Sequence, residues 1–200
     1  MGYMDSGSVT GSFRGNSSDV PMCGIITNRF ENSENVAQFK YGIAAGAGQA
    51  VAGNPVTVSN QAGGTSDNAI EGLNALCGNI SALATSVATT SGFLAQSPND
   101  VVPSVGGEAF PVSGFLSYVA LLGSKLRMWL PCDSTLKDVS MQQALAYDFT
   151  HGELSAAGGS YTTILPVRLL SAPVDAKQLV YSNSTGKATW TDCKAVMVEL

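Results

Sequence analysis

The central part of this chain has no positive charge. No Lys or Arg occurs from Tyr41 to Ser124, a segment that we call the base-free stretch. Lys, Arg, Asp and Glu make up 12% of the sequence, about half of the usual share in globular domains. Because a buried charge needs a partner, a neutral surface of small residues suits packing against copies of the same chain or a lattice. A low-charge domain without such contacts is the alternative interpretation.

The shortage of basic residues also argues against two kinds of partner. The ten Lys and Arg residues are scattered and the net charge is −5, so no nucleic-acid partner is expected, because phosphate neutralisation needs clustered basic residues. Glu71, Asn74 and Asn79 interrupt the longest apolar pattern, so no membrane span is expected. With 44% hydrophobic residues among 200, the chain is expected to fold as one domain.

Closely paired metal ligands are missing as well. Cys23, Cys77, Cys132 and Cys193 lie far apart, with no CxxC pair and only His151 as an imidazole ligand. A tetrahedral zinc site usually has two pairs of close ligands, so we expect no metal site and no cofactor. No secretory signal pattern begins the chain, and synthesis in a host cytoplasm would keep the thiols reduced.

Few residues are candidates for catalysis. His151 lies in a predicted turn, where it is either a base oriented by Asp148 or Glu153 or an exposed turn residue; the second interpretation is favoured. Asp133, Asp148 and Glu153 could also supply the acid pair of a carbohydrate hydrolase, although solvated turn acids are the commoner case. We therefore predict that the chain is not an enzyme and has no catalytic residues.

The two tryptophans are predicted to act as contact residues. Trp129 and Trp190 both lie in strand-like runs. They could stack against sugars, but anchors of a core or an interface are commoner in such positions. Both are therefore candidate interface anchors.

The N-terminal 20 residues differ from the rest of the chain. Residues 1–20 are rich in Gly, Ser, Asp and Asn, and Tyr3, Phe13 and Arg14 are their only large contact-capable side chains. This composition predicts a flexible arm that becomes ordered on a partner, with those three residues as candidate contacts. Residues 21–200 are predicted to form a single β-rich domain.

Short alternating runs separated by turn residues dominate that domain. The SGFL tetrapeptide, at 91–94 and 113–116, is expected to open a strand each time. Further strands are predicted at 22–26, 36–43, 55–59, 115–122, 125–130, 141–149, 162–170, 178–181, 188–190 and 195–200.

One helix is predicted inside the base-free stretch. Apolar residues recur at spacings of three and four from Ile70 to Val87, and Asn68 with Glu71 has the residue types of a capped start. We therefore expect a helix at about 69–88. The fold class is then mainly β: an antiparallel barrel or sandwich with one short helix and an extended N-terminal arm.

Several stretches resemble the small virion proteins that bacteriophages use as capsid decoration or structural cement. The resemblance covers about half of the chain and lies in the order of its strands and turns. The segments are VPMCGII (20–26), YGIAAG (41–46), KLRMWLPCD (125–133), AYDFTHGEL (146–154) and STGKATW (184–190).

This resemblance implies a β-rich, commonly trimeric protein on the capsid exterior that clamps major capsid protein subunits with loops and a terminal arm. It implies no catalytic residues. The predicted function is a non-enzymatic virion protein that decorates and stabilises a phage capsid as a homo-oligomer, with a trimer favoured. The alternatives are another virion component, such as a head-fibre base or tail protein, and a glycan-binding β module.

Overall fold

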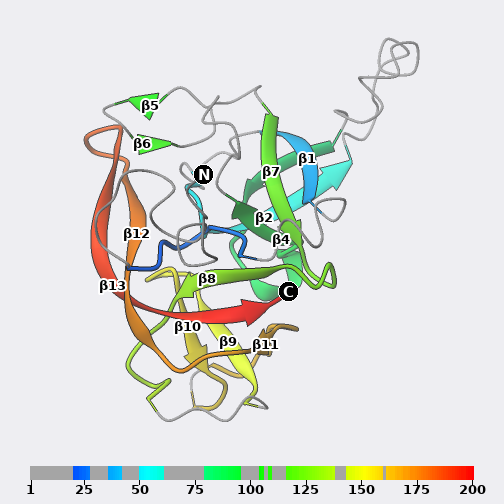
Figure 1. Ribbon diagram of the computed structural model, residues 1–200. Coiled ribbons are helices and arrows are strands. Elements are labelled where there is room, and N and C mark those ends of the chain that lie inside the picture. The colour runs from blue at the N-terminus through cyan, green and yellow to red at the C-terminus, as the bar shows by residue number, and fades with distance from the viewer. Residues whose placement is uncertain are drawn as a thin grey trace, which may run out of the picture.

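The chain folds mainly into antiparallel β-sheets, as predicted (Figure 1). The computed structural model describes residues 20–27, 36–41, 50–60, 79–95, 104–105, 108–109, 116–137, 143–159 and 161–200. The predicted arm, with Tyr3, Phe13 and Arg14, lies outside the described residues apart from Val20. None of the helices in the described part of the chain is long and apolar enough to cross a membrane.

Five strands pair into a closed, barrel-like ring, which we call the ring. They are β1 (Val36–Tyr41), β2 (Pro55–Asn60), β3 (Asn79–Leu83), β4 (Gly92–Ala95) and β7 (Leu116–Leu121). They pair in the order β1-β3-β2-β4-β7, and β7 pairs back with β1; only the β1–β3 pairing is parallel. Closure leaves none of the five strands at a sheet edge.

The remaining strands form smaller sheets beside the ring. The bounds are β5 (Ser104–Val105), β6 (Glu108–Ala109), β8 (Arg127–Pro131), β9 (Leu145–Asp148), β10 (Glu153–Ala156), β11 (Arg168–Leu169), β12 (Val174–Ser182) and β13 (Lys187–Glu199). β13 pairs with β8, β11 and β12, while β9 pairs with β10 and β5 with β6. Figure 1 shows β12 and β13 as a long curved hairpin along one side of the molecule.

One apolar core joins the ring to these sheets. Phe93 and Ala120 from the ring are fully buried in the same cluster as Met128 of β8, Leu145 of β9 and Val198 of β13. Burial of about 25 cal/mol per Å² of apolar surface makes this shared cluster a main source of stability. The ring and the sheets beside it therefore stabilise each other.

The predicted helix at 69–88 is wrong for its described part. Residues 79–83 form strand β3, and only Val87–Thr89 form one short 3-10 turn, η3; residues 69–78 lie outside the described part. The segment contains several Ser and Thr residues and Gly78, which have low helix propensity. β3 instead pairs on both sides, with β1 and β2, and this tertiary pairing outweighs the helical spacing.

Other boundaries differ in ways that pairing explains. The two runs predicted at 188–190 and 195–200 form the single strand β13, because Thr191 to Lys194 continue the ladder with β12. Strand β10 was not predicted; it pairs through four residues with β9. Of the strand predicted at 162–170, only Arg168–Leu169 pairs as strand β11.

The segment 20–27 connects strands that are distant in sequence. The N–H of Cys23 donates to the carbonyl of Lys177 in β12, at 2.9 Å, and that of Gly24 donates to the carbonyl of Trp129 in β8, also at 2.9 Å. Gly24 has φ +85°, and a Cβ there would lie 2.6 Å from the backbone of Ala52. Only glycine fits this crossing without a shift of the backbone.

Candidate functional site

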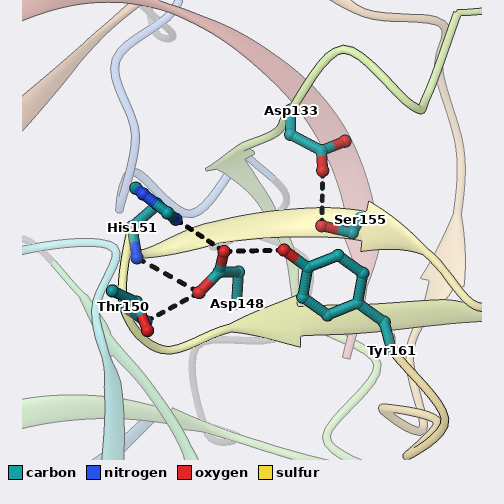
Figure 2. A network of polar contacts seen from close by, with 6 residues as sticks. All are labelled: Asp133, Asp148, Thr150, His151, Ser155 and Tyr161. Carbon is teal, nitrogen blue, oxygen red and sulfur yellow. Dashed lines mark hydrogen bonds and ion pairs between the residues drawn. The ribbon is translucent and has the colours of Figure 1, made fainter. Parts of the chain in front are cut away.

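Asp148 organises the turn between β9 and β10 (Figure 2). Its Oδ1 accepts hydrogen bonds from the N–H groups of Thr150, at 2.7 Å, and His151, at 3.2 Å. Its Oδ2 lies 2.6 Å from Nδ1 of His151 and accepts from the hydroxyl of Tyr161 at 2.8 Å. These four contacts use the lone-pair positions of the carboxylate, so Asp148 fixes the turn and the orientation of the imidazole.

The same contacts shift three pKa values. The hydrogen bond with His151 is the largest cause that holds the pKa of Asp148 well below its ordinary value. Partial burial acts in the opposite direction and raises this pKa. The hydrogen bonds from Tyr161 and from the N–H groups of Thr150 and His151 lower it further. The bond to Asp148 raises the pKa of His151 and that of Tyr161. Asp148 is therefore ionised at neutral pH.

His151 is exposed in a turn and is also oriented by a neighbouring carboxylate, the two features that the sequence suggested. Its side chain is 71% exposed in a turn, and its ring is oriented by Asp148. Its second ring nitrogen has no hydrogen-bond partner among the described residues, so it does not contact a described serine as a catalytic base would.

A second carboxylate connects β8 to β10. Asp133 accepts a hydrogen bond at 2.6 Å from the hydroxyl of Ser155, which is fully buried, and others from the N–H and hydroxyl of Thr135. The Thr135 hydroxyl in turn accepts from the N–H of Ala156 at 2.9 Å. Asp133 therefore has the geometry of a structural carboxylate.

Glu153 lies directly opposite Asp148 in the β9–β10 ladder. Burial and then the charge of Asp133 raise the pKa of Glu153, whereas the pKa of Asp148 is lowered. Opposite shifts of two carboxyl groups are found in glycoside hydrolases. However, Asp148 is occupied by four donors, and neither carboxyl group lines the cavity described next.

A cavity of about 200 Å³ lies between the ring, the β9–β10 turn and the β12–β13 hairpin. Its walls come from segments far apart in the sequence, which the shared core brings together. The ring side consists of Asn54, Pro55, Leu83 and Ala84; the turn side consists of Tyr147, Phe149, Thr150, His151 and Gly152; the hairpin side consists of Gln178, Leu179, Val180, Tyr181 and Asn183.

Tyr147 is the unusual member of this lining. Its side chain is 5% exposed, and its hydroxyl has no hydrogen-bond partner among the described residues. Burial is the main cause that raises the pKa of Tyr147 strongly. Asn54 lies near enough to lower this pKa, but the two side chains do not form a hydrogen bond. A buried hydroxyl without a partner costs about 1–3 kcal/mol and needs an explanation.

The two predicted anchors lie against separate small clusters. Trp129 in β8 is half-buried against Cys23, Ala176 and Ala195. Trp190 in β13 is half-buried against a cluster that includes Leu179. Each ring keeps an exposed part, so their role as interface anchors stays a prediction.

The described cysteines include a close pair. The sulfur atoms of Cys23 and Cys193 lie 3.9 Å apart, whereas Cys132 is buried elsewhere; Cys77 lies outside the described residues. The hydrogen bond with Cys193, with burial, raises the pKa of Cys23, and the same bond lowers the pKa of Cys193. Burial raises the pKa of Cys132 to about 12. Cys193 is also the only one of these three that is not fully buried, so it is the most accessible to a reagent.

We expect diamide to join Cys23 to Cys193 within one chain. The Cys193 thiolate adds to the N=N bond of diamide, the Cys23 thiolate then displaces the resulting hydrazine, and diamide takes up two electrons and two protons. The new disulfide closes a very long loop, so the free energy of unfolding should rise by up to about 4 kcal/mol. Peptide mapping and thermal unfolding measure both effects.

The variant Cys193→Ser is the control for this reaction, because Cys23 and Cys132 remain. It should show neither the cross-link nor the rise in stability. A disulfide that involves Cys132, or one that forms only between chains, would contradict the geometry of the pair.

In the described part of the chain, no group of three or more His, Cys, Asp or Glu side chains could hold a metal ion. A scan against models of protein families finds no matching family, and a search of curated proteins finds no match.

The cavity was not predicted from the sequence. The only signal for it was the segment 146–154, which supplies five of the lining residues.

Proposed function

We propose that this chain is a non-enzymatic virion protein that decorates and stabilises a phage capsid. It would bind major capsid protein subunits on the exterior of the shell and self-associate, with a trimer favoured. The observation that carries this proposal is the separation of charge between the ring and the sheets beside it.

Four ion pairs join strands outside the ring. Lys177 lies 3.0 Å from Asp192, and Lys194 lies 2.7 Å from Asp175, across the β12–β13 ladder. Glu199 in β13 contacts both Arg127 of β8, at 3.4 Å, and Arg168 of β11, at 3.0 Å. This side of the molecule has the charged surface of a solvated protein.

The ring has almost no charge. Residues 50–60, 79–95 and 116–124 contain no charged side chain, and Lys40 of β1 is the only one in the five strands. Exposed positions there include Thr85, Ala88 and Thr89, next to and within η3. A partner could cover this surface without desolvating a charge, which would otherwise cost several kcal/mol.

Part of the base-free stretch is neutral for a different reason. Val56, Leu94 and Val119 are buried inside the ring, so a charge at these positions would disrupt the core. The proposed contact surface is therefore limited to exposed, uncharged positions such as those within and beside η3. The resemblance to capsid decoration proteins supports a capsid as the partner; a head-fibre base or tail protein would use the same surface.

The N-terminal arm supplies the first test. The chain without residues 1–20 should remain a folded oligomer but lose binding to expanded shells of the phage that encodes it, because the arm is proposed to grip the capsid subunits. Co-sedimentation with purified shells measures binding, and light scattering measures the oligomer.

Two further chains serve as controls for this test. The variant Tyr3→Ala/Phe13→Ala should reproduce most of the loss in the full-length chain, whereas Thr185→Ala, in the exposed β12–β13 turn, should bind like the unaltered protein. Undiminished binding by the truncated chain would refute the role of the arm.

A further inference from the structure

We propose that the cavity beside the β9–β10 turn binds a single saccharide ring of a glycan. This inference does not depend on the proposed capsid function, because the walls of the cavity are formed by residues of one chain. Its support comes from the aromatic wall, the neutral polar groups and the size of the cavity.

The aromatic wall is held in place by neighbouring rings. Tyr147 and Phe149 meet edge to face, with ring centroids 5.0 Å apart at 63°, and Tyr147 meets Phe93 of the core in the same way at 5.9 Å and 60°. Tyr181 lines the opposite, hairpin side. Ligand sites combine such apolar walls with a few polar groups that fix orientation, and the C–H faces of a sugar ring suit these walls.

The polar groups of the lining are neutral amides and hydroxyls, with one imidazole. Gln178 and Asn183 each offer both donors and acceptors, as does the hydroxyl of Thr150. No carboxylate, Lys or Arg lines the cavity, and the nearby carboxylate of Asp148 is occupied by its four donors. A ligand that exchanges neutral hydrogen bonds, such as a hydroxylated ring, is favoured over an ion.

The imidazole has a fixed orientation in this wall. Nδ1 of His151 is bound to Asp148, and the second ring nitrogen has no partner among the described residues (Figure 2). It can therefore contact a ligand hydroxyl without giving up a bond within the protein. A side chain that is ordered before binding loses less conformational entropy when the ligand arrives.

The size of the cavity limits the ligand further. About 200 Å³ is less than the roughly 300 Å³ at which sites for drug-sized ligands begin, so one sugar ring fits better than an extended chain. The hydroxyl of Tyr147 lies next to Gly152, where a Cβ would come within 3.8 Å of it. This hydroxyl has almost no accessible surface, so it belongs to the packing behind the cavity wall and does not contact the ligand.

The test uses methyl glucoside, methyl galactoside, methyl mannoside and N-acetylglucosamine as probes. Saturation-transfer NMR on the full-length chain should detect at least one of them at concentrations up to about 10 mM, in the range of weak single-ring binding. Titration of that probe should then show at least about a tenfold loss of affinity for Asn183→Ala and for Gln178→Ala.

The matched control is Thr185→Ala, because Thr185 lies in the same exposed turn as Asn183 but does not line the cavity. It should bind the probe like the unaltered chain. Circular dichroism verifies that all three variants are folded. The proposal is overturned if none of the probes gives a signal, or if the affinity is unchanged in both cavity variants.

Discussion

Replacement of Gly92 by alanine is expected to lower the free energy of unfolding by about 3 kcal/mol or more. Gly92 begins β4 and pairs with Val56 of β2 on one side and with Leu121 of β7 on the other. A Cβ at this position would lie 2.3 Å from the carbonyl oxygen of Ala120 and 2.8 Å from Cα of Leu121. Both contacts are with backbone, so relief would require β4 and β7 to separate and the ring to open.

Urea unfolding followed by tryptophan fluorescence measures this loss, and Gly123→Ala is its control. Gly123 has φ +83° but no atom within 4 Å of a Cβ, so alanine there meets only the backbone penalty of about 1–2 kcal/mol. Equal losses in the two variants would contradict the tight closure of the ring at β4.

Introduction of a lysine at Ala88 is expected to weaken self-association by about a hundredfold or more. Ala88 is exposed in η3, in the uncharged surface of the ring. If a second copy covers this surface, an unpaired ammonium group there would cost about 3 kcal/mol or more. Sedimentation equilibrium of the unaltered chain and of Ala88→Lys gives the two association constants.

The matched control is Thr189→Lys. Thr189 is exposed in β13, opposite Val180 in the ladder, on the side of the molecule that already contains the ion pairs. The same added charge should leave the association constant unchanged there. A similar loss in both variants would show that net charge, and not the ring surface, controls association.

The local pattern of the sequence predicts most strands well. The alternating run predicted as a strand at 115–122 corresponds to β7 at Leu116–Leu121, and residues 127–130 of the run predicted at 125–130 lie in β8 at Arg127–Pro131. Both runs are bounded by turn residues, and each packs one side into the shared core. Strands with such a local pattern can be predicted without knowing which strands they pair with.

The predicted helix shows where local pattern fails. Ile80, Ala84 and Val87 have helical spacing, but the backbone at 79–83 is paired on both sides by β1 and β2. These partners are distant in sequence, so spacing within one segment could not identify them. The same limit applies to the cavity, whose walls come from four distant segments.

The base-free stretch was predicted as a contact surface, and its described residues fall into two groups. Residues such as Val56 and Val119 are uncharged because they form the interior of the ring. Thr85 and Ala88 are uncharged although they are exposed. Composition alone does not distinguish a neutral core from a neutral surface, and only the exposed part can support the proposed interface.

Electron cryomicroscopy of shells saturated with the full-length chain tests the central claim most directly. The account predicts density for this protein on the shell exterior, with the outside of the ring at Thr85 and Ala88 covered by neighbouring copies or capsid subunits. The charged β12–β13 hairpin should face solvent. Shells without added density, or bound copies whose ring faces open solvent, would contradict the account.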